Sequence, residues 1–238
     1  MNARERMLGR LRAAAPARVS DDDLKRLDDS IDLHYDNRRV ALPTQTLVES
    51  MQAALTASHA EVFRATERTW PALIAQHLQQ ANIKRLLLDT SRAEGAALQQ
   101  ALPPDVATRN YDQPIEHWKA ELFDTIDAGF TVARSGLAAT GTLIVAPDSG
   151  SPRTMSLVPP LHIALVYAHT LHADLHAAMR AERWQAGMPT NLVMISGPSK
   201  TSDIQQTLAY GAHGPRELWV VIVEHHADNA ALEHGDAA

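Results

Sequence analysis

The residues best suited to chemistry lie late in the chain, in a turn that follows a short apolar run. Residues 191–195 predict a buried strand, and Ser196 and Gly197 open a turn rich in hydroxyl groups. Ile204 and Leu208, four residues apart, predict a short helix directly after this turn. The first N–H groups of a helix attract anions, and a glycine lets a ligand approach the backbone. The stretch therefore predicts an anion site, although a well-capped helix without a ligand would explain the same residues.

Donor groups in and around this turn define the predicted ligand site. The residues assigned to it are Ser196, Gly197, Ser199, Lys200, Thr201 and Asp203. We expect Asp203 to stabilise the start of the predicted helix, because a negative charge there interacts well with the helix dipole. A role as an acid or base, or in discouraging an anion, stays open for this carboxylate.

A second polar loop, marked by glycines, is predicted between two strands at residues 130–133 and 141–146. Its candidate ligand-binding residues are Ser135, Gly136, Thr140, Gly141 and Thr142. We expect this loop to face the first one across a single crevice, with Arg153 as a cationic wall. The carboxyl ends of parallel strands form such crevices, and this one would suit a small carboxylate or a phosphate.

Two histidines are candidate catalytic residues. His162 opens a predicted buried strand after a Pro-Pro pair, and His213 precedes Gly214 in a loop whose glycines permit unusual backbone angles. Either imidazole could act as a general base, bond a ligand, or simply satisfy loop carbonyls. We also assign Gly214 to the ligand site.

A third group of histidines is a candidate for metal binding. His172 and His176 lie four apart on a helix predicted over residues 171–186, and such a pair can share a metal ion. The residues predicted on the buried face of this helix are Leu171, Leu175, Ala178 and Met179. This leaves the histidines facing solvent, so we assign no metal ligand.

The composition excludes several kinds of chemistry. The 238 residues include no cysteine, so thiolate nucleophiles, disulfides and cysteine-ligated zinc or iron–sulfur clusters cannot form within this chain. A formal net charge of −6 argues against nucleic-acid binding. The N-terminus lacks the apolar core of a signal peptide, and no run is long enough to span a membrane. We therefore expect a cytoplasmic protein.

The elements that must position these residues alternate between strands and helices. Strands are predicted at residues 61–65, 86–88, 106–111, 130–133, 141–146, 161–167, 191–195 and 218–223. Helices are predicted at residues 44–57, from 71 to about 78, and at 91–102, 115–127 and 171–186. This alternation, with an inserted β segment, predicts an α/β fold built on an open, mostly parallel sheet with helices on both faces.

Three regions are expected along the chain. They are an N-terminal helical or irregular arm at residues 1–45, an α/β domain at 46–225 and a flexible tail at 226–238. Within the arm, helices are predicted at residues 3–14 and 21–27. The apolar residues that follow alternate as in a strand: Ile31, Leu33 and Tyr35. We expect the arm to dock on its own domain or on a neighbouring subunit.

Three sequence blocks resemble the lactate-utilization protein C family, whose members share the LUD domain. The blocks are Gly-Leu-Ala-Ala-Thr-Gly-Thr-Leu at 136–143, Arg-Thr-Met-Ser-Leu-Val-Pro-Pro-Leu-His-Ile at 153–163, and Ser-Gly-Pro-Ser-Lys-Thr-Ser-Asp-Ile at 196–204, continued by Gly-Ala-His-Gly-Pro at 211–215. Most relatives have glutamate where this chain has Ala139, which counts against carboxylate chemistry there. Many have arginine where it has Lys200, which keeps the charge but loses a bidentate fork.

This resemblance implies both a fold and a function. The fold is the one shared by ribose-phosphate isomerases, glucosamine-phosphate deaminases and CoA-transferases, which does not by itself determine function. The function is that of a component in a three-protein system that oxidises L-lactate to pyruvate, in which iron–sulfur subunits carry the electrons. Lacking cysteine, this chain would be the cluster-free component, which binds substrate or supports assembly and electron transfer.

Two alternatives stay open at this stage. One is a free-standing isomerase- or CoA-transferase-like enzyme that acts on a phosphorylated or carboxylated small metabolite. The other is a non-catalytic structural subunit. In each case we expect no cofactor in this chain, and the oligomeric state is left open.

Overall fold

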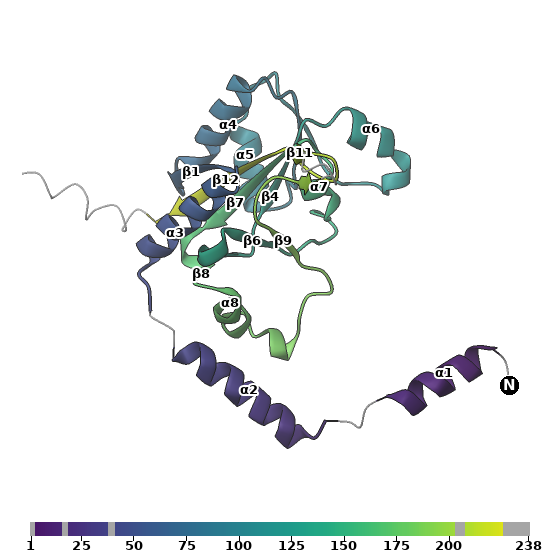
Figure 1. The fold of residues 1–238 in the computed structure, drawn as a ribbon. Helices are drawn as coiled ribbons and strands as arrows, with labels where there is room; N and C mark the ends of the chain where they lie inside the picture. The colour runs from purple at the N-terminus through teal and green to yellow at the C-terminus, as the bar shows by residue number, and fades with distance from the viewer. Residues whose placement is uncertain (1–2, 16–18, 38–40, 203–207, 226–238) are drawn as a thin grey trace, which may run out of the picture. The chain divides into compact units, whose positions relative to one another are not determined.

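The computed structural model describes residues 3–15, 19–37, 41–202 and 208–225. The chain divides into two compact units, Met1–Ala41 and Leu42–Ala238 (Figure 1). The predicted tail at 226–238 lies outside the described residues, as does Asp203.

The described residues of the first unit form two helices, α1 (Ala3–Ala14) and α2 (Asp21–Asp36), neither of which has a buried residue. The strand-like alternation predicted around Ile31 to Tyr35 is wrong, because α2 continues through it. The hydroxyl of Ser20 accepts a hydrogen bond from the Asp23 N–H at 3.1 Å and caps the helix. Three aspartates in the first turn stabilise this helix start further.

The second unit is built on a six-stranded sheet in which all neighbouring strands are parallel. In spatial order its strands are β1 (Glu61–Thr66), β12 (Glu217–Glu224), β7 (Leu161–Tyr167), β4 (Ala128–Val132), β2 (Arg85–Leu87) and β3 (Ala107–Arg109). The central strands β7 and β12 are nearly continuous apolar runs, as expected for strands covered on both faces. The predicted open parallel sheet is therefore confirmed.

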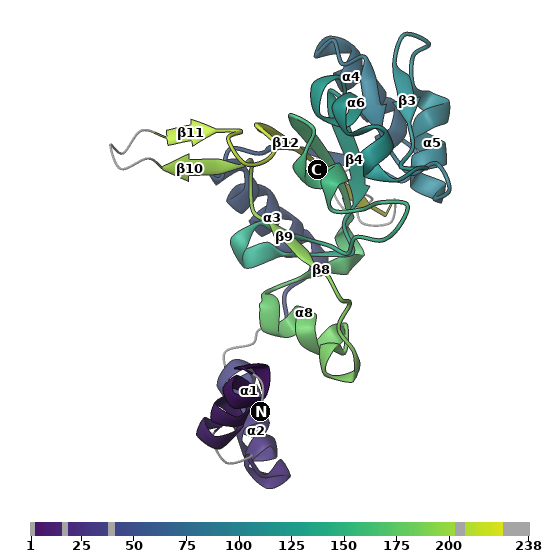
Figure 2. The same cartoon turned by 90° about the vertical axis from the view of Figure 1, so that its right-hand side faces the viewer.

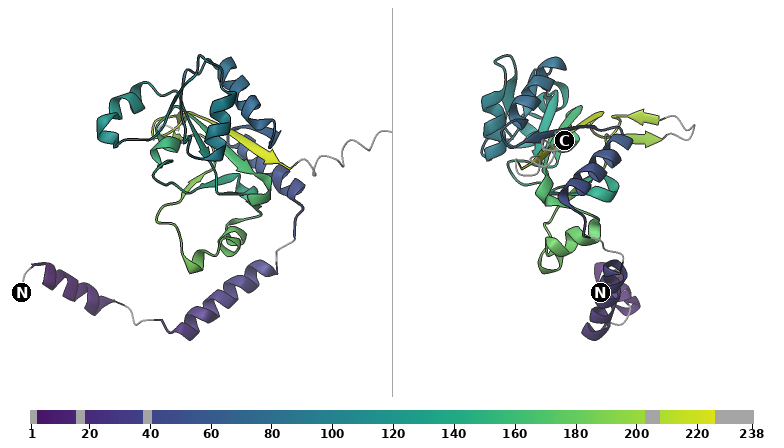
Figure 3. Two further views of the ribbon diagram at one scale, coloured as in Figure 1. Left: turned by 180° about the vertical axis from the view of Figure 1, so that it is seen from behind. Right: turned by 90° about the vertical axis from the view of Figure 1, so that its left-hand side faces the viewer.

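Helices and a second sheet cover the two faces of this sheet (Figures 1 and 3). The helices of this unit are α3 (Thr44–Ala57), α4 (Trp70–Gln80), α5 (Ala93–Ala101), α6 (Lys119–Asp124), α7 (Thr154–Leu157) and α8 (Leu175–Ala181). Trp70 and Ile74 of α4 and Leu98 of α5 join one buried core with Phe130 of β4. Met51 of α3 belongs to the core on the other face.

The inserted β segment forms a separate four-stranded sheet. Its strands, in spatial order, are β8 (Leu171–His172), β5 (Ser135–Leu137), β6 (Thr142–Val145) and β9 (Val193–Ile195). Strand β9 pairs antiparallel with β6. The apolar run predicted at 191–195 is thus a strand, but it does not belong to the parallel sheet.

After β9, the residues at both ends of the predicted helix form strands, so the prediction is wrong there, and its middle, residues 203–207, lies outside the described residues. Strands β10 (Lys200–Ser202) and β11 (Leu208–Tyr210) pair antiparallel, and Figure 2 shows them extending away from the six-stranded sheet. Two apolar residues four apart amount to one helical turn, which is too little to offset the cost of helix nucleation. The pairing of Thr201 with Ala209 supplies backbone hydrogen-bond partners from farther along the chain instead.

Two other predicted helices are shorter than expected. The one at 115–127 consists of the 3₁₀ turn η1 (Ile115–His117) and α6. Helix α8 begins only at Leu175, because the Asp174 carboxylate accepts a hydrogen bond from the Ala177 N–H at 2.8 Å and caps it. The 3₁₀ turns η3 (Ala168–Thr170) and η4 (Trp184–Ala186) flank this region.

Candidate functional site

A cavity of about 190 Å³ lies where the turn after β9 meets the loop before β12. It is lined by Ser156, Leu157, His162, Val193, Met194, Ile195, Ser196, Gly197, Pro198, Ser199, His213, Gly214, Pro215 and Leu218. Most of the wall is apolar, and the polar side chains among these residues are hydroxyls and imidazoles. None of these residues carries a carboxylate, an ammonium or a guanidinium group. The cavity suits a small ligand with an apolar part and a few polar atoms.

The cavity lies at the opposite end of the strands from the crevice predicted by the sequence. His162 and Leu218 are the second residues of β7 and β12, and they are partners in the parallel register. The turn at Ser196 therefore lies near the amino-terminal ends of these strands. The prediction of a crevice at their carboxyl ends is wrong for this turn, because the turn follows a strand of the second sheet.

Backbone hydrogen bonds hold the two loops of the cavity together. The Ser199 N–H donates to the Pro215 carbonyl at 2.8 Å, and the Gly211 N–H donates to the Ser199 carbonyl at 2.9 Å. A Cβ atom at Gly214 would come within 3.1 Å of the Ser199 Cβ. The two segments predicted to bind a ligand are thus in contact across one cavity, although they are 10 or more residues apart in sequence.

Gly197 allows the turn to pack against the end of α3. Its φ is 136°, and a Cβ atom there would lie 2.7 Å from the Ser58 carbonyl oxygen. Residues with side chains rarely adopt this φ and could not fit this contact. The glycine is therefore required by the path of the chain beside the cavity.

His162 is the most deeply buried polar group of the cavity, with 1% of its surface exposed. Its Nε2 lies 2.8 Å from the Thr131 hydroxyl oxygen. Its Nδ1 is buried and has no hydrogen-bond partner among the described residues. Burial lowers the pKa of His162 from the ordinary 6.5 to about 3, so the ring is neutral at physiological pH.

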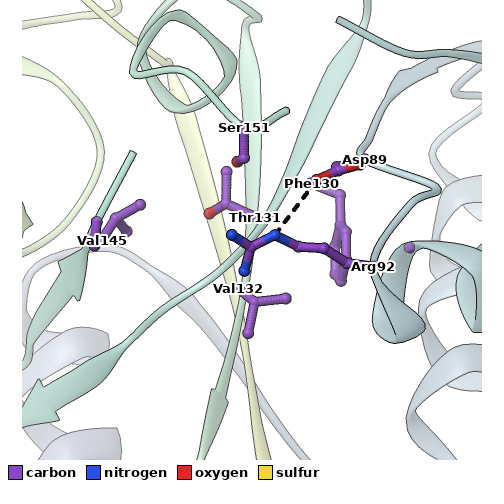
Figure 4. Close-up of a pocket in the computed structure, with 9 residues that line it drawn as sticks. Asp89, Arg92, Phe130, Thr131, Val132, Val145 and Ser151 are labelled. Atoms are coloured by element: carbon purple, nitrogen blue, oxygen red, sulfur yellow. Dashed lines mark ion pairs between the residues drawn. The ribbon is translucent and has the colours of Figure 1, made fainter. Parts of the chain in front are cut away.

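A second, much smaller cavity of about 20 Å³ adjoins Thr131 (Figure 4). Its charged groups are Asp89 and Arg92, whose Oδ2 and Nε atoms are 3.4 Å apart, and Arg92 also forms an ion pair with Asp148. A volume of this size has room for about one water molecule. Thr131 lines this small cavity, while its hydroxyl contacts His162, which lines the large one.

The predicted glycine-threonine loop reaches the cavity through one hydrogen bond. The hydroxyls of Thr142 and Ser196 are 2.8 Å apart, and those of Thr140 and Thr142 are 2.7 Å apart. Gly141 has a φ of 59° and packs against the backbone of α3. Thr142 thus stabilises the turn through the Ser196 hydroxyl. Thr140, Gly141 and Thr142 do not line the cavity themselves.

Ser135 and Gly136 lie within the second sheet, away from the cavity lining. The Ser135 hydroxyl donates to Glu182 Oε1 at 2.5 Å, and Arg134 Nε lies 2.5 Å from Glu182 Oε2. Burial raises the pKa of Glu182, but hydrogen bonds from Ser135 and Trp184 and the charge of Arg134 outweigh it, so this pKa lies below its ordinary value. A Cβ at Gly136 would collide with Leu171, so this glycine serves packing.

The predicted cationic residues do not line the cavity. Arg153 and Lys200 are exposed, and Thr201 lies in the hairpin strand β10. Because residues 200–202 form strand β10, they do not present the helix-start N–H groups that the sequence predicted there. Ala139 is also exposed and lies outside the lining.

Several lining residues were missed by sequence reasoning. Ser156 and Leu157 belong to the quoted block at 153–163, so the block itself was a usable signal. Val193 and Leu218 are predicted only as strand residues. Thr131, which contacts His162 without lining this cavity, lies inside β4 with no signal of a site. Pro198 and Pro215 were treated only as parts of turns.

The histidines considered for metal binding do not form a cluster. His172 lies in β8, and His176 is buried in α8, so the prediction that both histidines face solvent is wrong for His176. Of the predicted buried face, Leu171 and Ala178 are buried, whereas Leu175 and Met179 are exposed. Across the described ranges, no group of three or more potential ligands is placed to hold a metal. No described helix is long and apolar enough to cross a membrane.

Comparisons with known proteins place these features in a family. The profile of the LUD domain matches residues 48–223. An uncharacterized protein of Neisseria meningitidis serogroup B is 36% identical over 239 residues, covering 98% of this chain and 99% of that protein. Lactate utilization protein C of Shouchella clausii is 34% identical over 107 residues, covering 44% of this chain and 47% of that protein, or about half of each.

A solved structure shows the same fold. The crystal structure of a DUF162 family protein from Deinococcus radiodurans superposes with a TM-score of 0.58 at 23% sequence identity, covering 76% of this chain and 99% of that one. The profile match extends from α3 to β12 and so includes both sheets and every residue that lines the cavity. The chain belongs to the LUD domain family.

Proposed function

We propose that this protein is the cluster-free component of an L-lactate utilization system, which oxidises L-lactate to pyruvate together with iron–sulfur partner proteins. The observation that carries the proposal is the cavity of about 190 Å³, with apolar walls and neutral polar groups. Relatives named lactate utilization protein C support the same substrate class. The proposed system is cytoplasmic.

The size of the cavity favours a small acid as the ligand. An engineered cavity of roughly 150 Å³ binds benzene, which has about six non-hydrogen atoms. Lactate and pyruvate are of that size, whereas coenzyme A or a sugar phosphate is much larger. The volume therefore favours lactate or pyruvate as the ligand over the larger substrates of an isomerase- or CoA-transferase-like enzyme.

The composition of the chain supports the proposal that partner proteins accept the electrons. Oxidation of a 2-hydroxy acid releases two electrons, which need an acceptor. Without cysteine this chain cannot ligate an iron–sulfur cluster through thiolates, so in the proposal the partner subunits hold the clusters and accept the electrons. This chain would bind the acid or position it for those subunits.

An anaerobic reconstitution tests this proposal. The isolated protein, its cluster-containing partners and the full mixture are assayed for lactate-dependent reduction of an artificial electron acceptor. We expect turnover only in the full mixture. Full turnover by the isolated protein would contradict the proposal, as would full turnover by the partners without it.

Calorimetric titration of the isolated protein with lactate and pyruvate separates a ligand-binding component from a purely structural subunit. We expect saturable binding that weakens in His213→Ala, because His213 lines the cavity. Lys200→Ala is a matched control, since Lys200 is exposed and outside the lining. Absence of binding by the wild-type chain would favour the structural role.

A further inference from the structure

Within the described part of the chain, the buried ring of His162 has one nitrogen with a hydrogen-bond partner and one without. His162 uses one ring nitrogen, Nε2, for the 2.8 Å contact with Thr131. Its other nitrogen, Nδ1, is buried and has no partner among the described residues, and His162 lines the large cavity. An unpaired buried polar group destabilises the folded protein, so a ligand in the cavity that bonds Nδ1 gains the free energy of satisfying it.

The Thr131–His162 hydrogen bond can run in either direction. A hydroxyl is both a donor and an acceptor, and a neutral imidazole carries its proton on one nitrogen or the other. If Thr131 donates to Nε2, the ring proton lies on Nδ1, which is then a donor. If Nε2 donates to Thr131, Nδ1 has a free lone pair and is an acceptor.

Burial keeps the His162 ring neutral in both directions of this hydrogen bond. The pKa of His162 is lowered to about 3, so neither form involves an imidazolium at physiological pH. None of the described residues that line the cavity is an aspartate or glutamate that would stabilise a protonated ring. The pair therefore offers a donor or an acceptor at Nδ1 without a change of charge.

We propose that the Thr131–His162 pair recognises the oxygen on the second carbon of a small acid, in both its hydroxyl and its carbonyl form. Nδ1 accepts a hydrogen bond from the hydroxyl of a 2-hydroxy acid, and it donates one to the carbonyl of a 2-oxo acid. This inference rests on the proposed function and adds the residues that select the ligand class. It predicts that acids without an oxygen at that carbon, such as propionate, bind more weakly than lactate or pyruvate.

Two substitutions of His162 separate the roles of its nitrogens. In His162→Gln the amide reaches the position of Nε2 and loses the group at Nδ1, whereas in His162→Asn it stays near Nδ1 and loses the contact with Thr131. We expect His162→Gln to bind lactate and pyruvate about tenfold more weakly, in line with one lost hydrogen bond, and to bind propionate unchanged. His162→Asn should retain more of the preference for lactate over propionate.

His77→Gln is the control for removing an imidazole. His77 lies in α4, where its ring contacts Phe63 and Trp219 and does not line the cavity. Its substitution should leave the affinities for all three acids unchanged. Circular dichroism and thermal melts of each variant show whether the fold is intact before titration.

Nitrogen NMR of the wild-type imidazole tests the inference without any variant. The proton of His162 should lie on Nε2 in the lactate complex and on Nδ1 in the pyruvate complex. The same tautomer in both complexes would overturn the inference, as would equal affinity of the wild-type protein for propionate and lactate. If the wild-type protein binds none of the three acids, the proposed function fails and the inference falls with it.

Discussion

The hydroxyl oxygens of Thr142 and Ser196 lie 2.8 Å apart, 54 residues from each other in the sequence. This hydrogen bond joins the glycine-threonine segment of the second sheet to the turn that lines the cavity. Because Thr142 also contacts the hydroxyl of Thr140, a short chain of three hydroxyls supports the turn. The block at 196–204 therefore contributes residues to the cavity wall, and the block at 136–143 holds that part of the wall in place.

Breaking the Thr142–Ser196 contact should weaken ligand binding without removing a lining residue. Thr142→Val keeps the shape of the buried side chain and loses the hydroxyl. We expect a loss of about 1 kcal/mol in unfolding free energy and a several-fold weaker affinity for lactate. A double-mutant cycle with Ser196→Ala, followed by urea unfolding and calorimetry, measures the coupling. Strictly additive effects would show that the contact contributes nothing.

Substitution of Gly197 should displace the turn from α3. Gly197→Ala puts a side chain at a φ of 136° and within 2.7 Å of the Ser58 carbonyl oxygen. We expect destabilisation by roughly 1–3 kcal/mol together with weaker ligand binding. Gly187→Ala is the matched control, because a Cβ there meets nothing within 4 Å. Equal melting temperatures of the two variants would contradict the role assigned to Gly197.

The buried imidazole of His162 should make the protein less stable in acid. Its pKa is about 3 in the folded protein and 6.5 ordinarily, so below pH 6.5 the unfolded chain binds a proton that the folded chain does not. Stability from this residue is therefore unaffected above that pH and falls as the pH drops toward 3. The expected loss is about 2 kcal/mol by pH 5.

His162→Gln isolates this effect, because the other titrating groups are the same in both proteins. Urea unfolding at several pH values between 7.5 and 5 gives the free energy of unfolding of each protein. The difference between wild type and variant should shift in favour of the variant as the pH falls. A difference that stays constant over this range would argue against a depressed pKa.

The ion pair between Arg64 and Glu224 should stabilise the edge of the parallel sheet. Arg64 Nε and Nη2 each lie 2.7 Å from a Glu224 carboxylate oxygen, and Glu224 is only 4% exposed. Arg64→Met leaves this carboxylate buried without its partner, which should cost about 3 kcal/mol in unfolding free energy. Lys84→Met breaks an exposed pair with Asp105 and should cost less than about 1 kcal/mol. Similar losses in denaturant unfolding would refute this distinction.

The amino-acid sequence by itself determined the chemistry that is excluded and the main strands of the sheet. The absence of cysteine needs no structure to interpret. The apolar runs of β7 and β12 predicted buried parallel strands, because a strand covered on both faces has no polar side to alternate with. The sequence blocks that resemble the LUD family also contain His162, Ser196 and His213, all of which line the cavity.

The tertiary structure alone decided where these residues meet. Whether the apolar run at β9 joins the parallel sheet or the second sheet depends on its hydrogen-bonded partner, and that partner, β6, is about 50 residues away. The same pairing places the cavity at the amino-terminal ends of β7 and β12. Cross-strand hydrogen bonds between residues 200–202 and 208–210 form two strands at the ends of the predicted helix. Local periodicity reports which residues are buried, but backbone pairing between distant segments determines which buried residues share a cavity.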